Sequence, residues 1–354
     1  MAENTFFGEI HKELNAKTIP CGKWNMPLFY PGGSVAEHRH FYSGAVIFDR
    51  SMVRCFQISG KRIGELLDEI FLSPVSDMPV GGCRENVLLN GDGTFALIFT
   101  LCRMQDDDFM LLGDSGIADK EWSYLRNVLP GTDIRELDSV MAQLAVSGSK
   151  SAEILQAAGA ETLPDEDHWQ MITLKDADGD EYRTIAVHTK LFGKDSFHLC
   201  FDARYALEVY GALYEVPGIA PAGIGAWESL RIENGQPAAP QELKSTLHPA
   251  DCGLGQRVDM TRNFAGKTAL AGVKQSFKLF LIKLDRHPAE PGTIVELSGK
   301  AAGTVTSSAY CPVAGCALAI CRIDALGTVK NGDKTGCAVN GKNIDGDVVR
   351  EIYR

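Results

Sequence analysis

The chain has 354 residues, 45% of them hydrophobic and 23% charged, which is typical of a globular protein with a core large enough for two or three domains. Its formal net charge of −11 argues against nonspecific binding to nucleic acid or anionic membranes, because both require a cationic surface. No apolar run of about 18 residues predicts a membrane span, and no apolar stretch typical of a secretory signal follows the first methionine, so a cytoplasmic protein is expected.

The first 140 residues mix short strands with helices. The predicted elements are strands at 45–48, 53–58 and 109–112 and helices at 61–71 and 118–129. Asn90-Gly91 and Asp92-Gly93 favour left-handed backbone, so a β-hairpin is predicted around them. Its outgoing strand, 95–99, contains no polar side chain, which limits the chemistry that this strand can perform.

The next segment, about 140–235, repeats this mixture. The predicted elements are strands at 143–146, 184–187 and 197–201 and helices ending at 158, 214 and 232. Ser149 and Ser151 are candidate N-caps for the first of these helices, and Asp202 is the candidate N-cap for the second. Asn234-Gly235 is a plausible C-cap pair for the third.

Beyond residue 274, strands dominate. They are predicted at 277–284, 293–297, 303–306, 316–323 and 347–353, separated by glycine turns, which is typical of an all-β barrel or sandwich. Cys311, Cys316 and Cys321 match no common zinc motif and are predicted to be buried small apolar side chains. All ten cysteines are expected to be reduced thiols.

Three short motifs do not support a site. Gly266-Lys267-Thr268 resembles the end of a P-loop, but Thr261 stands where the loop requires its first glycine. On a strand, His38 and His40 would face one side, but no paired carboxylate or cysteine completes a metal-ligand set, so one is expected to form structural hydrogen bonds and the other to be exposed. Residues 223–225 are expected to be a tight turn before a helix.

Six segments together carry a family resemblance. They are GKWNMPLFYPGGSVAEH (22–38), GAVIFDRSM (44–52), LLNGDG (88–93), GIGAWESLRIENG (223–235), CGLGQRVDMTRNFAGKTAL (252–270) and GTVTSSAYCPVAGCALA (303–319). In this order and spacing they resemble the aminomethyltransferase family, the T-protein of the glycine cleavage system. The resemblance extends over nearly the whole chain.

The resemblance implies an α+β fold of three domains around a central cavity, a cloverleaf with a C-terminal β-barrel. It implies two interleaved α+β domains of the folate-binding type, roughly 1–140 and 141–274, and a barrel at 275–354, which agrees with the change in pattern near residue 274. It also implies that the cavity holds tetrahydrofolate, which accepts a one-carbon unit from an aminomethyl group on a lipoyl carrier protein. Relatives use the same pocket for demethylation.

This chain departs from the family where the resemblance implies catalysis. The family's strand after the hairpin carries an aspartate pair, and alignment on Asn90–Gly93 places that pair on Leu97 and Ile98. A carboxylate beside a reacting amine orients it and stabilises developing positive charge, whereas a hydrocarbon can do neither. The family's aspartate position is therefore Leu97 here, the catalytic residue is left unassigned, and whether the chain is an enzyme stays open.

Two further motifs differ from the family. Its Gly-Glu-Asp-Gly, which the resemblance makes a pterin-binding element, is Gly193-Lys194-Asp195-Ser196 here, so an acceptor is replaced by a donor. Its first arginine in the Ala-Arg-Asp-Ser-Leu-Arg motif, the implied partner of the folate tail, is Trp227 here, and only Arg231 remains.

Three functions follow as alternatives. In the first, the pocket is rebuilt for one-carbon transfer on a folate-like ligand, with Glu85 as a carboxylate, Lys194 as an anion partner and Trp227 as a stacking platform. In the second, the scaffold binds folate or another anion, or assembles, without catalysis. The third is a folate-dependent demethylase. The expected ligand-binding residues are Met26, Glu85, Lys194, Asp195, Trp227, Arg231 and, through a C-terminal aromatic of the family, Tyr353.

Overall fold

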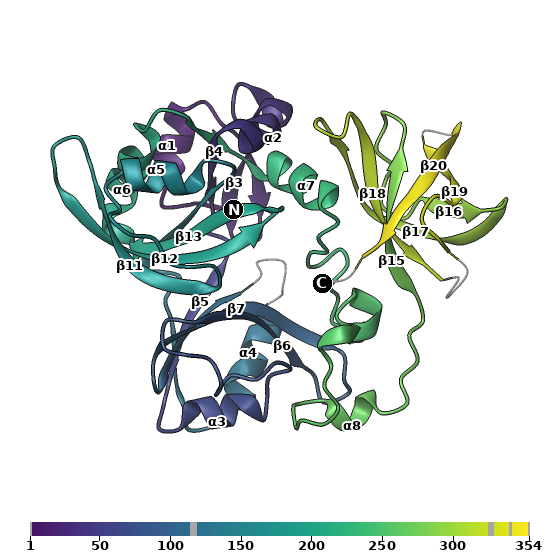
Figure 1. Ribbon diagram of the computed structural model, residues 1–354, viewed down its shortest axis with the longest axis horizontal. Helices are drawn as coiled ribbons and strands as arrows, with labels where there is room; N and C mark the ends of the chain where they lie inside the picture. The colour runs from purple at the N-terminus through teal and green to yellow at the C-terminus, as the bar shows by residue number, and fades with distance from the viewer. Residues whose placement is uncertain (1, 114–118, 325–328, 340–341, 353–354) are drawn as a thin grey trace.

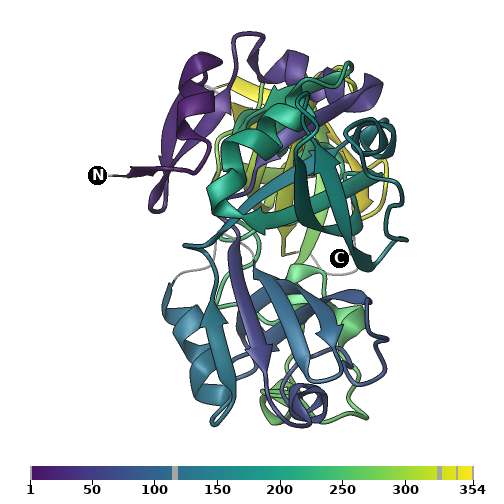
Figure 2. The same cartoon turned by 90° about the vertical axis from the view of Figure 1, so that its left-hand side faces the viewer.

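The computed structural model describes residues 2–113, 119–324, 329–339 and 342–352. Figure 1 shows three bodies grouped around a centre: a first sheet with its helices, a second sheet with its helices, and a barrel. Figure 2, a quarter turn away, again shows the first body above the second. The architecture is the α+β cloverleaf with a C-terminal barrel that the sequence predicts.

The first body is built on a six-stranded sheet of order β11-β12-β13-β10-β4-β14. Its strands are β4 (Ala45–Asp49), β10 (Met141–Ser147), β11 (His168–Lys175), β12 (Glu181–Leu191), β13 (Lys194–Asp202) and β14 (Ile219–Ala222). The helices that cover one face are α1 (Gly8–Glu13), α5 (Ser151–Ala157) and α6 (Ala206–Tyr214). Leu155 and Leu213 of these helices pack against Leu144 and Leu199 of the sheet, which leaves the opposite face turned to the centre.

Two more helices close the first body on its inner side. They are α2 (Gly33–Ser43) and α7 (Ile224–Glu233), beside a small sheet of β1 (Glu3–Asn4), β3 (Trp24–Phe29) and β2 (Lys17–Cys21). Phe41 of α2 and Leu230 of α7 pack against Phe48 of β4. Gly223, the N-cap of α7, lies so close to the backbone of Leu28 that any Cβ would clash with it.

The second body is a five-stranded antiparallel sheet of order β6-β7-β8-β5-β9. Its elements are β5 (Arg54–Ser59), α3 (Ile63–Asp68), β6 (Cys83–Leu89), β7 (Phe95–Gln105), β8 (Asp108–Gly113), α4 (Asp119–Val128) and β9 (Asp133–Glu136). The predicted hairpin is present, because β6 and β7 pair around Asn90–Gly93, where the Gly93 amide donates to the Asn90 carbonyl. Leu67 and Leu125 of the helices pack onto Leu101 and Leu111 of the sheet.

A connecting segment covers the other face of this second sheet. It contains η2 (Pro249–Cys252), η3 (Gly255–Arg257) and α8 (Lys267–Leu270). Leu243, Leu254 and Phe264 of this segment pack against Val87 and Phe95 of the sheet. The chain therefore passes across the second body before it enters the barrel, as Figure 1 shows beside α8.

The third body is a closed barrel of order β15-β18-β17-β16-β19-β20. Its strands are β15 (Lys278–Leu284), β16 (Ile294–Leu297), β17 (Lys300–Cys311), β18 (Cys316–Ile323), β19 (Lys334–Val339) and β20 (Lys342–Glu351). Ile282, Val295 and Cys321 lie in its core. None of the ten cysteines forms a disulfide; nine of them are buried, and Cys21 is partly exposed.

Some predicted details differ from the structure. The expected division near residue 140 falls between β9 and β10, but β4 pairs with β10, so the first sheet takes strands from both sides of it. Neither Ser149 nor Ser151 caps α5, because the Ser151 hydroxyl donates to the Asp195 carbonyl instead. The prediction for Asp202 is confirmed, since its carboxylate accepts from the Arg204 amide at the start of the following helical segment.

His38 and His40 lie on α2, not on a strand. Glu37, His38 and Phe41 are buried at helical spacing along α2. His38 Nδ1 lies 2.8 Å from the Ser229 hydroxyl, and His40 Nε2 lies 3.0 Å from the Gly218 carbonyl. Among the described residues, no helix is both long enough and apolar enough to cross a bilayer.

Candidate functional site

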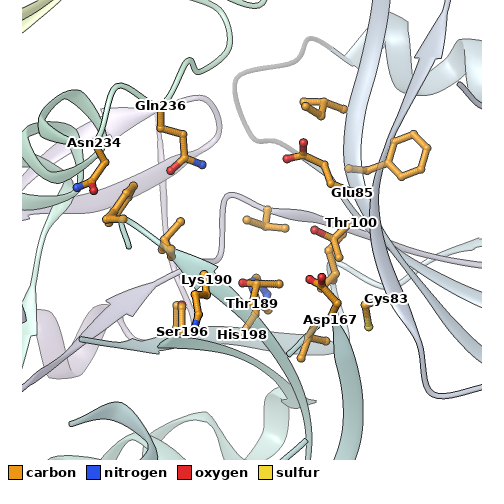
Figure 3. A pocket seen from close by; sticks show the side chains of 18 of the residues that line it. Cys83, Glu85, Thr100, Asp167, Thr189, Lys190, Ser196, His198, Asn234 and Gln236 are labelled. Atoms are coloured by element: carbon orange, nitrogen blue, oxygen red, sulfur yellow. The ribbon is translucent and has the colours of Figure 1, made fainter. Parts of the chain in front are cut away.

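A cavity of about 570 Å³ lies where the three bodies meet. The first sheet contributes Thr189, Ser196 and His198, and the second contributes Glu85, Ile98 and Thr100; the loop after α7 adds Asn234 and Gln236, the connecting segment Arg257, and the barrel Arg350. Figure 3 shows Glu85 and Thr100 on one side of the space, across from Thr189, Lys190 and Ser196. This volume lies within the range of small-molecule sites.

Strand alternation explains the wall formed by the first sheet. Phe197 and Leu199 of β13 point into the core under the helices, so Ser196 and His198 point the other way, into the cavity. Ser196 is buried, and its hydroxyl lies 2.6 Å from that of Ser147. The wall therefore presents hydroxyl groups and an imidazole to any ligand.

His198 supplies the imidazole of this wall. Its Nε2 lies 2.9 Å from Gln143 Oε1, and the Gln143 amide nitrogen donates to the Val53 carbonyl at 2.7 Å. Burial, together with the positive charge of Arg50, lowers the pKa of His198 to about 3. The ring is therefore neutral at physiological pH.

The wall formed by the second sheet is mostly apolar. Ile98 of β7 lines the cavity, whereas its neighbour Leu97 is fully buried in the core between the second sheet and its helices. Glu85 of β6 lies opposite Thr100 of β7, and its carboxylate forms a 2.7 Å ion pair with Arg257. Of the two hydrocarbon side chains at the aligned aspartate positions, only Ile98 contacts the cavity.

Several cationic side chains line the cavity. Arg84 pairs with Asp77 at 2.8 Å, and Lys190 Nζ lies 3.3 Å from Glu166. Arg350 of β20 donates to the Asn234 carbonyl, and within the described ranges no carboxylate pairs with it. Asn234 is followed by Gly235, whose φ of +61° and whose approach to Arg350 leave no room for a side chain.

Trp227 lies between this cavity and a second one of about 450 Å³. The guanidinium carbon of Arg50 lies 3.8 Å from the centroid of the Trp227 ring, and both side chains line both cavities. Phe48 and Phe192 contact the ring edge-on, with centroids 5.1 and 5.0 Å away. Met26, expected near the ligand, lines the second cavity and not the central one.

Arg231 serves a different purpose from the one expected. Its side chain is 2% exposed and pairs with Glu228 at 2.7 Å and Glu242 at 3.2 Å, and it donates to the Ser307 hydroxyl at 2.8 Å. This set of four residues, called the Arg231 joint below, connects α7 to β17 of the barrel. Arg231 does not line the cavity, so its motif position did not reveal its surroundings.

The remaining expected residues lie at or beyond the margin of the site. Lys194 begins β13 with its Nζ 5.9 Å from the Tyr42 ring centroid, and Asp195 pairs with His188 at 3.0 Å; neither lines the cavity. Tyr353 lies outside the described residues. The sequence interpretation missed His198, which the alternation of β13 could have indicated, and Arg350, for which the sequence offered no local signal.

Comparison with known families adds to this geometry. Residues 7–262 match the profile of the GCVT N-terminal domain, and residues 278–344 match that of the CAF17 C-terminal beta-barrel domain. An aminomethyltransferase from Porphyromonas gingivalis is 26% identical, with 99% of each chain covered. An aminomethyltransferase from Deinococcus deserti is 29% identical, with 89% of this chain and 87% of the relative covered.

A solved structure has the same fold. It is the glycine cleavage system aminomethyltransferase T from Bartonella henselae, with a TM-score of 0.89 and 23% identity. The alignment covers 99% of this chain and 97% of that one. At this identity the likeness establishes the three-body arrangement, and the chemistry of the site is left to the residues described above.

Proposed function

We propose, from the premise that the chain belongs to the GCVT N-terminal domain family, that it binds a tetrahydrofolate-class ligand in the central cavity and transfers a one-carbon unit, aminomethyl or methyl. Folate-dependent one-carbon transfer is supported at the level of the family by the similarity to aminomethyltransferases. The identity of the one-carbon donor is the open part of this proposal.

The observation that carries the proposal is the cationic side of a cavity shared by all three bodies. Arg350 reaches it from the barrel and donates to the backbone carbonyl of Asn234, and Arg257 reaches it paired with Glu85. A folate has a flat heteroaromatic end and an anionic glutamate tail. Guanidinium groups suit the carboxylates of that tail, because a fork of N–H donors matches a carboxylate.

The polar wall formed by the first sheet suits the heteroaromatic end of such a ligand. Thr189, Ser196 and His198 line the same space, and within the described residues no partner occupies the Nδ1 atom of His198. Bound tetrahydrofolate would supply the nitrogen that accepts the one-carbon unit. The chain would orient that ligand between the two sheets and exclude water from it.

Glu85 is the candidate for the missing carboxylate. It lies on the strand next to that of Ile98, in the same cavity, and its carboxylate pairs with Arg257. An ionised carboxylate near the reacting nitrogen would stabilise positive charge as the carbon is transferred. We therefore propose Glu85, rather than Leu97, as the electrostatic residue of the reaction.

One observation favours the non-catalytic alternative. The wall at Ile98 is apolar, so the position that carries the family's acid can bind a ligand face but cannot handle a proton. In this alternative the same cavity binds folate or another anion without turnover. A folate-dependent demethylase would use the same cavity with a methylated small molecule as the donor.

Calorimetric titration tests the proposal. Tetrahydrofolate and 5-methyltetrahydrofolate are each titrated into the full-length protein, and saturable binding is expected. No heat up to millimolar ligand would reject the proposal and the folate-binding alternative together.

Turnover separates the two remaining functions. Ammonia release from an aminomethylated lipoyl carrier protein, with tetrahydrofolate present, is expected at a rate on the order of 1–1000 per second. Binding without turnover of this donor or of methylated amines would favour the non-catalytic function. Docking of a lipoyl carrier protein and a cytoplasmic location remain predictions that this assay and cell fractionation address.

A further inference from the structure

We propose that His198 is a specificity-determining residue of the cavity wall formed by the first sheet. Its Nδ1 atom accepts one hydrogen bond from a neutral N–H or O–H group on the heteroaromatic end of the ligand. In this proposal, Gln143 is a positioning residue that fixes the tautomer of the ring. The inference deepens the proposed function and rests on it, because it names the ligand edge that the cavity selects.

The position of His198 in the sheet is the first step. His198 lies directly opposite Ala145 on the neighbouring strand, and both residues line the cavity. A methyl group is the smallest side chain that could stand there, so it leaves the imidazole room to lie across β10. The ring tip then reaches Gln143, two residues along β10, and the side of the ring that carries Nδ1 is left without a described partner.

The tautomer follows from the partners of Gln143. The Val53 carbonyl can only accept, so the amide nitrogen of Gln143 must point to it, at 2.7 Å. The amide oxygen is then the atom that faces His198 Nε2 at 2.9 Å, and it too can only accept. The proton of a neutral imidazole is therefore on Nε2, and Nδ1 carries a lone pair.

The neutral charge of the ring preserves the lone pair on Nδ1 at physiological pH. Burial and the neighbouring Arg50 both disfavour a second proton on the ring and lower its pKa. A neutral acceptor with one lone pair differs from a carboxylate, which offers two oxygens and a negative charge. Unlike a carboxylate, His198 can therefore accept one hydrogen bond only, and it supplies no negative charge that would select a cationic or doubly donating edge.

Nitrogen NMR of the labelled protein tests the tautomer without any ligand. The expected result for His198 is a pyridine-type signal at Nδ1 and a pyrrole-type signal at Nε2 near neutral pH. Gln143→Leu removes the fixed acceptor, so its spectrum should show both tautomers. A pyrrole-type Nδ1 in the wild type would overturn the inference whether or not folate binds.

Calorimetry with tetrahydrofolate tests the ligand contact. His198→Phe keeps a ring but removes the acceptor, and its affinity should fall about five- to tenfold, the effect of one hydrogen bond. His198→Asn places an amide oxygen near the Nδ1 position and should recover part of the loss. His188→Phe is the control, because His188 lies on the adjacent strand β12, outside the cavity, with both ring nitrogens bonded to the protein.

The outcomes distinguish the inference from the proposed function. Wild-type protein that binds tetrahydrofolate while His198→Phe binds equally well overturns the role of His198 and leaves the proposed function intact. Wild-type protein that does not bind overturns the proposed function and the ligand contact together. An equal loss in His198→Phe and His188→Phe would attribute the effect to the sheet as a whole and would also overturn the inference.

Discussion

The Arg231 joint and the central cavity are neighbouring regions, each centred on arginine, but their charges are arranged differently. In the joint, Arg231 is 2% exposed and bonds to Glu228, Glu242 and Ser307. In the cavity, Arg350 is half-buried and donates to a backbone carbonyl. A charge whose partners come from the protein holds domains together, whereas a charge with open donors at a cavity is available to a ligand. The predictions below test this difference.

The largest effect is expected from removal of the joint's arginine. Arg231→Met leaves Glu242 buried without its ionic partner, and we expect the free energy of unfolding to fall by about 3–5 kcal/mol. Urea denaturation measures the loss. Arg204→Met is the control, because Arg204 pairs with Asp202 at the surface, where water screens the pair, and its removal should cost far less. Equal urea midpoints for the two variants would contradict the claim that the buried ion pairs of Arg231 stabilise the fold more than a surface pair does.

Aspartate substitutions at two adjacent positions of β7 should differ in stability, because one side chain lies in the core and the other lines the cavity. Leu97→Asp buries an acid among apolar side chains and should destabilise the fold by about 3 kcal/mol or more. Ile98 is also buried, but it lines the cavity, so Ile98→Asp has apolar neighbours on fewer sides and should destabilise the fold less. Thermal unfolding of both variants measures the difference. If Ile98→Asp proved the more damaging, the assignment of the two faces would be wrong.

Removal of Arg350, one of the arginines that line the cavity, should affect binding and not folding. Arg350→Met is expected to weaken tetrahydrofolate about 10–100-fold, the effect of losing a charge-assisted bond. The unfolding midpoint should change little. Lys334→Met serves as the control, since it removes the same charge from an exposed position of the barrel outside the cavity. Calorimetry and thermal unfolding on the same samples give both quantities, and an equal loss of affinity in both variants would argue against a direct contact.

The smallest effect is a dependence of stability on pH. The folded pKa of His198, about 3, lies below its usual value of 6.5, so the unfolded chain binds a proton that the folded chain does not. Stability is therefore unaffected above pH 6.5 and is lost as the pH falls from 6.5 toward 3. At pH 5 the wild type should lose about 1–2 kcal/mol more than His198→Gln, relative to pH 7. Urea titrations at the two pH values measure the free energy of unfolding of both proteins. Equal losses in the wild type and in His198→Gln would contradict a ring that is neutral in the folded state.

Much of the fold followed from local patterns in the sequence. The apolar run at 316–323 coincides with β18, and the Asn-Gly and Asp-Gly pairs predicted the turn between β6 and β7. Such features depend on neighbouring residues, which a single sequence displays. The helix that carries His38 and His40 was missed because its buried positions became clear only once α7 was packed against it.

The site was harder to predict because its residues come together from distant segments. Lys194 was expected at the ligand from its place in a motif, but it lies at the first position of β13, outside the cavity, whereas His198, further along the same face of the strand, lines the wall. Arg231 was expected at the ligand as well, but Glu242 and Ser307 surround it, and neither lies within its motif. A motif gives the position of a residue along the chain, whereas the face that its side chain occupies depends on partners elsewhere.

The central cavity takes its lining from all three bodies, so none of them contains the complete site when separated from the others. Any molecule that fits there acts as a crosslink that favours the closed arrangement over states in which the barrel or the second sheet has swung away. At a hundred times its dissociation constant, such an occupant would add about 2.7 kcal/mol to the assembled form. Resistance to proteolysis at the junctions between the bodies would then report occupancy, even for a ligand that undergoes no reaction.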